Sequence, residues 1–347
     1  MREAVFEFQL LTPAILAGAD QHTAEMRIPS IRGALRWWTR LLAGDDEEKN
    51  IFGYVKGNEC YPSTVTLRLL NESKRISDSQ NTVSVTKDKY DYFLWPLNTN
   101  LRGIIQEGSR FKVAVQVKPG CEESDWFEFI IKAFLLFGSL GTRSRRAYGS
   151  VWPISAEFDG EKWDIPQTVD ELLNEADTFL EYANVSIYSL SDSCRDYAQA
   201  IKKCSTFLKK IRCGKDAYGC TASKWGKSDH DAGLQKVDKI YRAALGLPLT
   251  QKYSSSKKTV NYSIKDLDRM ASPLHFKIVK LGKDYVPLML VIPEYVPQSG
   301  TCVSAKENKG ASFTLKLDNS LLNILQNNAE ELSDEIKPLA YYPMEDE

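Results

Sequence analysis

The order of strand-like and helix-like segments in residues 1–158 constrains the fold of this chain more than any other sequence feature. Segments typical of strands, rich in apolar and β-branched residues, fall at 4–11, 63–70, 87–95, 110–117 and 150–158. Between them, the spacing typical of a helix with a buried face covers 30–44 and 125–137. The sequence therefore predicts an α+β fold in which strands and helices share one core.

This order of elements has a known arrangement. The split βαβ or ferredoxin-like plan has the order strand, helix, strand, strand, helix, strand. This chain shows that order with an extra hairpin component. RRM modules share it, and their open sheet face often binds RNA. We therefore expect residues 1–158 to form one RRM-like, ferredoxin-like domain.

The pattern in the second half of the chain is weaker. We expect a second ferredoxin-like domain over 159–320, with inserted hairpins and helices, followed by a C-terminal helix and acidic tail over 321–347. The polar segment 214–233 is predicted to be a mobile loop. The expected elements are helices at 169–182, 193–212 and 235–245, a hairpin at 274–281 and 285–292, a strand at 313–317, and a final helix from 321.

Composition excludes several classes of protein. The formal net charge is −1, so any nucleic-acid surface must arise from local segregation of charge. Seven scattered cysteines and an N-terminus typical of a strand predict reduced thiols in a cytoplasmic protein, and no apolar run approaches the roughly 20 residues of a membrane span. We expect no membrane association.

The segment 27–44 combines a buried stripe with a basic one. It holds four arginines and no acid, and Arg32, Arg36 and Arg40 follow one another at intervals of four along the predicted helix. Ser30 is the expected N-cap and Gly44 the expected C-terminal stop. A solvated basic face is one interpretation. The other is a phosphate site, because Gly33 has no side chain and the first turn has free N–H groups.

A second basic segment, 138–149, follows the apolar helix at 125–137. Gly138 and Gly141 permit unusual backbone conformations, and they precede three arginines and Tyr148. A C-cap and turn would explain the glycines alone. Arginines beside a ring favour a nucleic-acid contact, since such grooves combine cations with stacking faces. In a ferredoxin-like domain, both basic segments would face one groove.

Several of these segments resemble a known family. TPAILAGADQ (12–21), IPSIRGALRWWTRLLAG (28–44) with the following IFG, and GSLGTRSRRAYGSV (138–151) resemble the RAMP superfamily of CRISPR-associated RNA-binding proteins. Within it, the chain is most similar to the first RAMP subunits of the type III-B effector complex. ALGLPL (244–249) and RMASPLHFKIVKL (269–281) extend the resemblance to the second half. Thr39 departs from the family pattern, in which a third bulky residue often follows the two tryptophans.

The resemblance implies a noncatalytic subunit with two ferredoxin-like domains that helps to hold the 3′ portion of CRISPR RNA and target RNA. Its expected partners are those RNAs and other RAMP subunits, and no cofactor or metal is expected. The candidate RNA-binding residues, from the residue patterns and the resemblance together, are Arg27, Ser30, Arg32, Gly33, Arg36, Trp37, Arg40, Gly138, Gly141, Arg143, Ser144, Arg145, Arg146, Tyr148, Arg269 and Lys277.

Two other functions are weighed against this one. His22, near Asp20, could act as the general base of a metal-independent endoribonuclease that processes CRISPR RNA, although a hydrogen-bonding role is more common for such a residue. Alternatively, the arginine helix could contact an acidic protein in a scaffold.

A metal site receives little support. Cys204, Cys213, Cys220 and His230 lack the short Cys-x2–4-Cys spacing of zinc sites, which makes them poor metal ligands. No phosphate-loop, dinucleotide-binding or zinc-protease motif is present.

Overall fold

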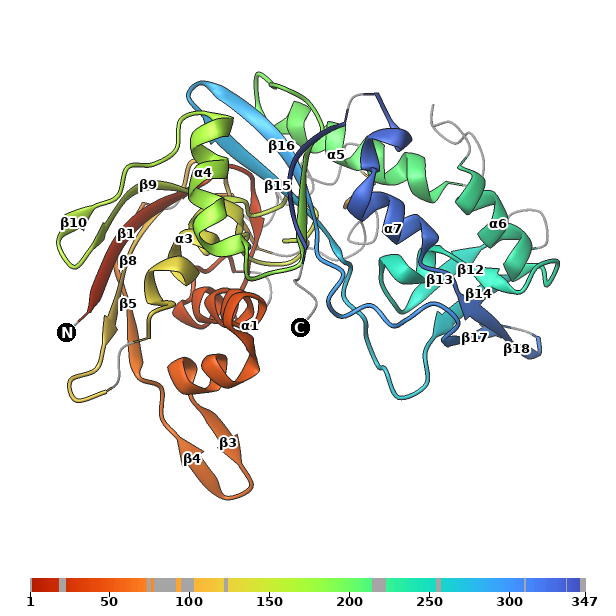
Figure 1. Cartoon of the computed structure of the whole chain (residues 1–347), viewed down its shortest axis with the longest axis horizontal. Coiled ribbons are helices and arrows are strands. Elements are labelled where there is room, and N and C mark those ends of the chain that lie inside the picture. The colour runs from red at the N-terminus through yellow and green to blue at the C-terminus, as the bar shows by residue number, and fades with distance from the viewer. Residues whose placement is uncertain are drawn as a thin grey trace.

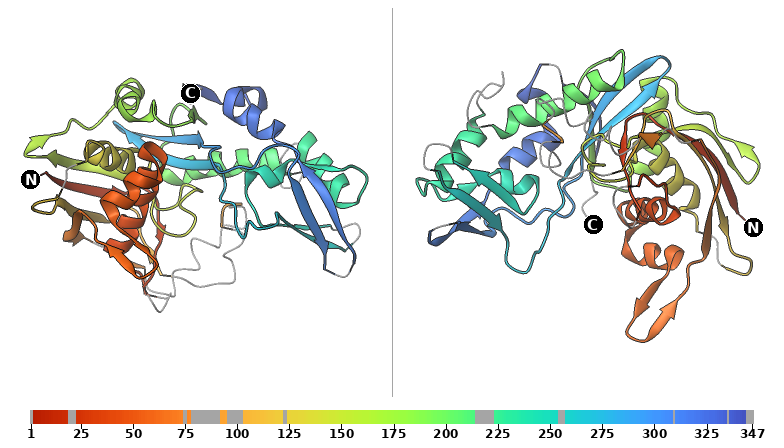
Figure 2. Two further views of the ribbon diagram at one scale, coloured as in Figure 1. Left: turned by 60° about the horizontal axis from the view of Figure 1, so that its bottom comes forward. Right: turned by 180° about the vertical axis from the view of Figure 1, so that it is seen from behind.

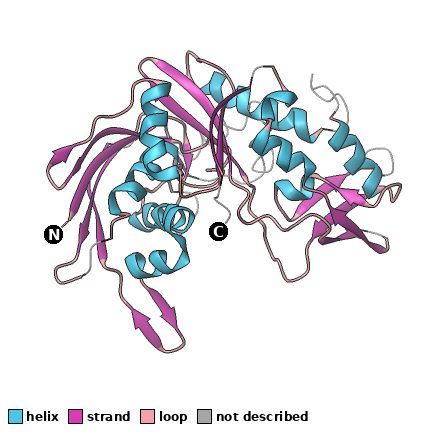
Figure 3. Cartoon of the chain, viewed as in Figure 1, coloured by secondary structure: helices cyan, strands magenta, loops and turns pink. Residues whose placement is uncertain are grey.

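The structure is a computed structural model in which both strands and helices occur in both halves of the chain (Figure 3). It is an α+β protein, as predicted, and three sheets of four or five strands form its framework. The residues that it describes are 2–18, 23–73, 76–77, 92–94, 103–121, 124–213, 223–253, 257–308, 310–334 and 336–343.

The first sheet has the strand order β10-β9-β1-β8-β5, and neighbouring strands are antiparallel. Helices α1 (Ile28–Phe52) and α3 (Phe127–Phe137) connect β1 to β5 and β8 to β9. They cover the face where Phe6 and Phe8 of β1 are fully buried (Figure 1). The strands are β1 (Glu3–Leu10), β5 (Val65–Ser73), β8 (Arg110–Val117), β9 (Val151–Phe158) and β10 (Glu161–Lys162).

The second sheet has the order β15-β16-β11-β19, again antiparallel. After α4 (Val169–Leu180), helix α5 (Tyr197–Arg212) lies between β11 and β15 in the chain, and α7 (Ser320–Asn327) lies between β16 and β19. The strands are β11 (Val185–Ser189), β15 (Leu274–Leu281), β16 (Asp284–Val291) and β19 (Lys337–Tyr342).

A third sheet, of order β12-β18-β17-β14-β13, is inserted into the second unit at two points of the chain. It lies at the opposite end of the molecule from the first sheet (Figure 2). With it come α6 (Lys224–Gly233) and the 3-10 helix η3 (Arg242–Leu245). Its strands are β12 (Lys239–Ile240), β13 (Leu249–Lys252), β14 (Thr259–Ser263), β17 (Cys302–Glu307) and β18 (Ser312–Leu317).

The remaining elements are small. The hairpin of β3 (Tyr54–Lys56) and β4 (Glu59–Tyr61) extends away from the first unit (Figure 1). A three-stranded sheet and a 3-10 helix complete the described structure: β2 (Ala14–Ile15), β6 (Ile76–Ser77), β7 (Ile104–Ile105) and η4 (Ala329–Leu332). Across the described ranges, every helix is too short or too polar to cross a lipid bilayer.

Four predictions of elements were wrong where the structure describes them. The expected helix at 235–245 is instead the short strand β12 followed by η3, and 224–233 form α6 rather than a loop. Residues 92–94, expected within a strand, form a turn, and the acidic C-terminal segment contains β19. Residues 214–222 and the rest of the strand predicted at 87–95 lie outside the described residues.

Candidate nucleic-acid interface

The start of α1 differs from the prediction by one turn. Arg27, not Ser30, occupies the N-cap position, and no side chain caps the helix there. Ser30 lies within the first turn, where its N–H donates to the Arg27 carbonyl at 2.9 Å. Gly44 has a φ of 83° and interrupts the helix as predicted, but a second helical segment continues to Phe52.

Helix α1 presents three different faces, because successive residues are about 100° apart around its axis. Ile31 and Leu35 are buried in the core. Arg32 and Arg36 lie on a second face. The third face, with Ser30, Gly33, Ala34 and Trp37, lines a cavity of about 250 Å³.

This cavity brings the two basic segments of the sequence together. Besides α1, it is lined by the loop that follows α3 and by β15 of the second unit. Phe137, the last residue of α3, also lines it, and the lining residues from the loop and β15 are Gly138, Ser139, Leu140, Gly141, Ser144, Arg145, His275 and Phe276.

Gly33 is the lining residue whose lack of a side chain has no structural explanation. It lies in the interior of α1, is exposed, and a Cβ added to it would meet no atom within 4 Å. A helical glycine destabilises a protein by roughly 0.5–1 kcal/mol relative to alanine. At Gly138 and Gly141, by contrast, an added Cβ would lie 2.3 and 2.5 Å from carbonyl oxygens of Phe134 and Ile15. Those two glycines are therefore required by the fold.

Arg145 provides the positive charge of the cavity. Its guanidinium donates to the Ser272 carbonyl at 3.2 Å and lies 5.8 Å from the centroid of the Trp37 ring. Burial lowers the pKa of Arg145, and the charge of the nearby, exposed Arg269 lowers this pKa further. Arg145 and Trp37, two predicted residues that are far apart in the sequence, therefore lie close together.

Trp37 packs between the two units of the chain. Its ring stacks on His275 of β15, with centroids 4.9 Å apart and an interplanar angle of 26°. Burial, together with the charges of Arg145 and Arg146, lowers the pKa of His275 well below its usual value, so its imidazole is neutral at pH 7. The sequence placed Trp37 on the flank of the helix, but its stacking partner depends on tertiary structure.

The loop after α3 also joins the second sheet through its backbone. The Phe276 N–H donates to the Arg145 carbonyl at 3.2 Å, and the Ala147 N–H donates to the Phe276 carbonyl at 3.0 Å. Arg146 donates to the Leu274 carbonyl at 3.0 Å. Burial lowers the pKa of Arg146 to about 9, with further contributions from Arg212 and Arg143, so this arginine stays charged at pH 7.

Two predicted contact residues are inaccessible and must be removed from the set. Tyr148 is 4% exposed and packs in the core. Lys277 is 1% exposed, and its amine donates to the carbonyls of Gly138 and Val151. Burial lowers the pKa of Lys277 well below its usual value. Both side chains lie in the protein interior and are not accessible to a ligand at the surface.

The arginine ladder is also partly used by the protein. Arg32 donates to the Phe52 carbonyl at 2.6 Å and lies over the Phe52 ring, and its pKa is lowered by burial and by Arg36. Arg36 forms an ion pair with Glu48, whose side chain is 6% exposed. The second segment of α1 thus folds back and contacts both arginines, but both side chains stay partly exposed, so their contact with a phosphate remains a prediction.

The remaining candidates are located as follows. Arg27 is exposed at the start of α1, and the charge of Arg40 acts on Glu294 and Tyr295. Arg143 has a φ of 67° and is half-buried in the loop. His22, the candidate base, lies outside the described residues.

The four residues weighed as zinc ligands in the sequence lie in different surroundings where the structure describes them. Within those ranges, no three histidine, cysteine or acidic side chains gather as metal ligands. Cys204 is buried in α5, and the His230 ring packs 5.1 Å from that of Tyr253. Cys220 lies outside the described residues.

The sequence analysis missed the contribution of β15 to the cavity wall. His275 and Phe276 line the cavity because the loop after α3 pairs with the edge of the second sheet. No local pattern in 274–281 indicates this pairing, since the strand alternates like many others.

Comparison with known proteins supports the resemblance stated above. The sequence model described as "RAMPs: RAMP superfamily" matches residues 7–152. The CRISPR system Cmr subunit Cmr1-1 of Pyrococcus furiosus is 29% identical over 303 residues, which cover 80% of this chain and 83% of that protein. Cmr1-2 of the same organism is 25% identical over 187 residues, covering 44% of this chain and 95% of the relative.

The fold has a counterpart among solved structures. The crystal structure of Cmr1 from Pyrococcus furiosus in its apo form matches with a TM-score of 0.58 and 18% sequence identity. The match covers 99% of this chain and 100% of that one. The likeness therefore extends over both units and the inserted third sheet.

Proposed function

Because this chain belongs to the RAMP superfamily, we propose that it is a noncatalytic RNA-binding structural subunit of a type III-B CRISPR effector complex. Its RNA ligands would be the 3′ portion of CRISPR RNA, target RNA, or both, and its protein partners other RAMP subunits. The similarity to a Cmr subunit over 80% of the chain supports this assignment.

The two units are both inferred to be ferredoxin-like. We number the strands of each sheet by their order in the chain. The first sheet without β10 is β9-β1-β8-β5, which gives the order 4-1-3-2. The second sheet, taken from β19 to β15, has the same order 4-1-3-2. In each, a helix follows the first strand and another precedes the fourth. This is the β-α-β-β-α-β order of the split βαβ motif.

The observation that carries the RNA-binding proposal is the cavity between α1, the loop after α3, and β15. Gly33 leaves the helix backbone open to close approach, and Arg145 supplies positive charge in the same cavity. The exposed Arg269 is near enough to Arg145 for its charge to act on that side chain. Such features suit a ribose-phosphate backbone and carry no means of reading bases. We propose that base pairing between guide and target supplies the specificity.

Salt-dependent RNA binding tests this proposal. Arg269→Gln should weaken binding of a single-stranded RNA about equally for all sequences and lower the slope of log K against log salt by about 1. Lys306→Gln removes one exposed positive charge from β17, away from the cavity, and is the matched control. Equal slopes for both variants and the unaltered chain would contradict the proposed interface.

The same preparations distinguish the competing functions. Specific cleavage of a CRISPR repeat RNA in EDTA, abolished by His22→Ala, would replace the structural role with an endoribonuclease. Failure of the unaltered chain to bind any RNA would favour the scaffold interpretation, in which the basic surface contacts an acidic protein.

A further inference from the structure

The hairpin of β3 and β4, which projects from the first unit (Figure 1), carries an exposed apolar surface. Tyr54 and Tyr61 lie directly opposite each other in it, and their rings stack with centroids 4.4 Å apart and an interplanar angle of 6°. Tyr61 is 43% exposed, and the neighbouring Val55 is 70% exposed. Apolar side chains gathered on a projecting hairpin add little to the core, so they indicate a binding surface.

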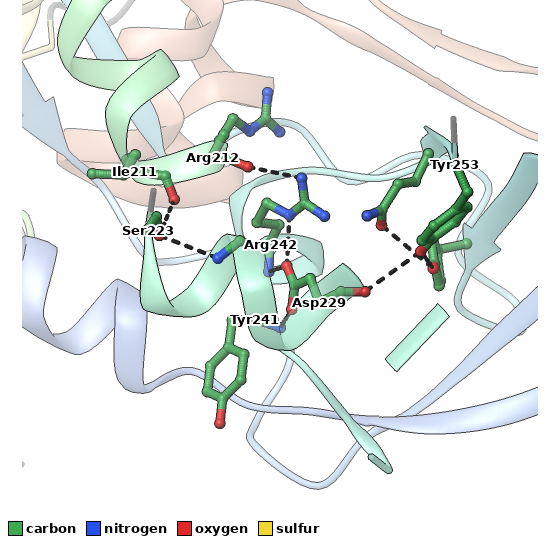
Figure 4. Close-up of polar contacts among 10 residues, drawn as sticks. Ile211, Arg212, Ser223, Asp229, Tyr241, Arg242 and Tyr253 are labelled. Atoms are coloured by element: carbon green, nitrogen blue, oxygen red, sulfur yellow. Dashed lines mark hydrogen bonds and ion pairs between the residues drawn. The ribbon is translucent and has the colours of Figure 1, made fainter. Parts of the chain in front are cut away.

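A second tyrosine pair in the chain shows what a structural role looks like. Tyr253 and Tyr262 are buried, their hydroxyl oxygens lie 2.8 Å apart, and Tyr253 also donates to the Asp229 carbonyl at 3.4 Å (Figure 4). Packing and internal hydrogen bonds explain that pair. The hairpin pair lies at the surface instead, where the Tyr61 hydroxyl donates to Glu59 at 2.8 Å and the ring is thereby held in place.

A groove of about 480 Å³ opens beside the stacked tyrosines. The base of the hairpin is held against the end of α1, because the Thr64 N–H and the Ser63 hydroxyl both donate to the Ile51 carbonyl, at 3.0 and 2.9 Å. A side chain of α1 therefore reaches the groove. The lining residues are Arg36, Gly53, Tyr54, Val55, Cys60, Tyr61 and Pro62.

Arg36 is able to contact a ligand in this groove. Its Nε donates to Glu48, yet the arginine side chain is still 37% exposed. Among the described residues, Glu48 provides its hydrogen-bond acceptor, and only Nε is used. A guanidinium has five N–H donors, so the terminal amino groups of Arg36 can bind phosphate oxygens.

The position of the groove on α1 favours RNA as its occupant. Gly33 and Trp37 line the cavity described above, and Arg36, which lies between them in the sequence, lines the groove. Residues 33 and 36 are about 60° apart around the helix axis and about 4.5 Å apart along it, so the two sites lie on adjoining faces of one turn. The groove thus continues the proposed interface, and a polyanion complements the charge of Arg36. Grooves for single-stranded nucleic acid combine such cations with aromatic faces.

We propose that Tyr54 and Tyr61 form a stacking site for one base of single-stranded RNA, and that Arg36 binds the adjoining phosphate. This inference rests on the proposed RNA-binding function and adds a base contact to the backbone contacts of the cavity. The base extends the stack of the two tyrosine rings. Every base has a π face, so the site selects an unpaired base and not a sequence.

The test compares three tyrosine variants of the full chain. Tyr61→Leu removes the exposed ring, and Tyr61→Phe keeps the ring but removes the hydroxyl that binds Glu59. Tyr341→Leu makes the same change at an exposed tyrosine of β19, in the second sheet. Binding is measured at several salt concentrations with a labelled single-stranded RNA and with an abasic RNA of equal length. Thermal unfolding without RNA verifies that each variant is folded.

We expect Tyr61→Leu to lower the affinity for the base-containing RNA about 5- to 150-fold, the range typical of one stacked base. The slope of log K against log salt should not change, because tyrosine carries no charge. Tyr61→Phe and Tyr341→Leu should bind like the unaltered chain, and all four proteins should bind the abasic RNA equally. Arg36→Gln, by contrast, should lower the salt slope by about 1.

Failure of this site differs from failure of the proposed function. If the unaltered chain binds RNA and Tyr61→Leu binds it equally well, RNA binding stands, the stacking site is refuted, and the groove is a surface for a protein partner. A loss for Tyr61→Leu that is as large with abasic RNA would refute stacking in favour of a backbone contact. A salt slope unchanged by Arg36→Gln would refute the phosphate contact. If the unaltered chain binds neither RNA, the proposed function and the stacking site are both overturned.

Discussion

Replacing Gly33 with alanine should separate the requirements of folding from those of binding. Gly33 lies in the interior of α1, and an added Cβ would have open space around it. Alanine is favoured over glycine in a helix by roughly 0.5–1 kcal/mol. Gly33→Ala should therefore stabilise the protein, raising its Tm by about 1 °C for a chain of this size.

The same substitution should weaken RNA binding. A methyl group at this position would displace a bound backbone by about 2 Å, its van der Waals radius. That is enough to break one hydrogen bond to a charged group, which contributes about 1.5–3 kcal/mol. The expected loss of affinity is at least about tenfold.

Fluorescence anisotropy with a labelled single-stranded RNA, paired with thermal unfolding, measures both effects on the same preparations. Asn50→Ala is the matched control, because it raises helix propensity at an exposed position of α1 beyond the break at Gly44. The control should gain stability without losing affinity. A Gly33→Ala variant that binds RNA as tightly as the unaltered chain would refute close approach at this helix, and a destabilised one would refute the structural reasoning.

Two further substitutions address candidate residues that make contacts within the protein. Arg36→Ala should destabilise the chain by about 1–2 kcal/mol in urea unfolding, since it leaves the buried Glu48 unpaired while the arginine itself is partly exposed. Arg36→Ala together with Glu48→Gln should recover most of the loss. Because the pKa of Lys277 is lowered in the folded state, the unfolded chain binds more protons below pH 10.5, and stability should rise from pH 7 to pH 9. Lys277→Met should remove that rise; an unchanged pH dependence would show that the amine is not the cause.

The first unit was largely predictable because its elements are specified by local patterns. Residues 110–117 alternate cleanly and form β8 with the predicted bounds, and α3 ends at Phe137 as expected. Gly44 was identified as a helix stop, and it adopts the positive φ that favours glycine. The second unit was less predictable, because β11 and β19 depend on long-range pairing: β11 pairs with β16 on one side and with β19 on the other.

The candidate interface divides in a similar way. The sequence placed a basic helix and a basic glycine loop in one groove, and the structure joins Gly33 and Arg145 in one cavity. The sequence did not predict that Glu48 binds Arg36, because that contact depends on the direction that the chain takes after Gly44.

The sequence by itself determined the helix and strand periods, the mixed α+β class and the positions of the arginines, because these depend on neighbours within a few residues. Only the tertiary structure decided which charges remain available. Lys277 and Arg36 carry the same formal charge as Arg269, yet carbonyl and carboxylate groups from distant segments satisfy the first two. How far a charge contributes to a binding surface depends on how much of it such contacts bury, and this is settled by long-range packing.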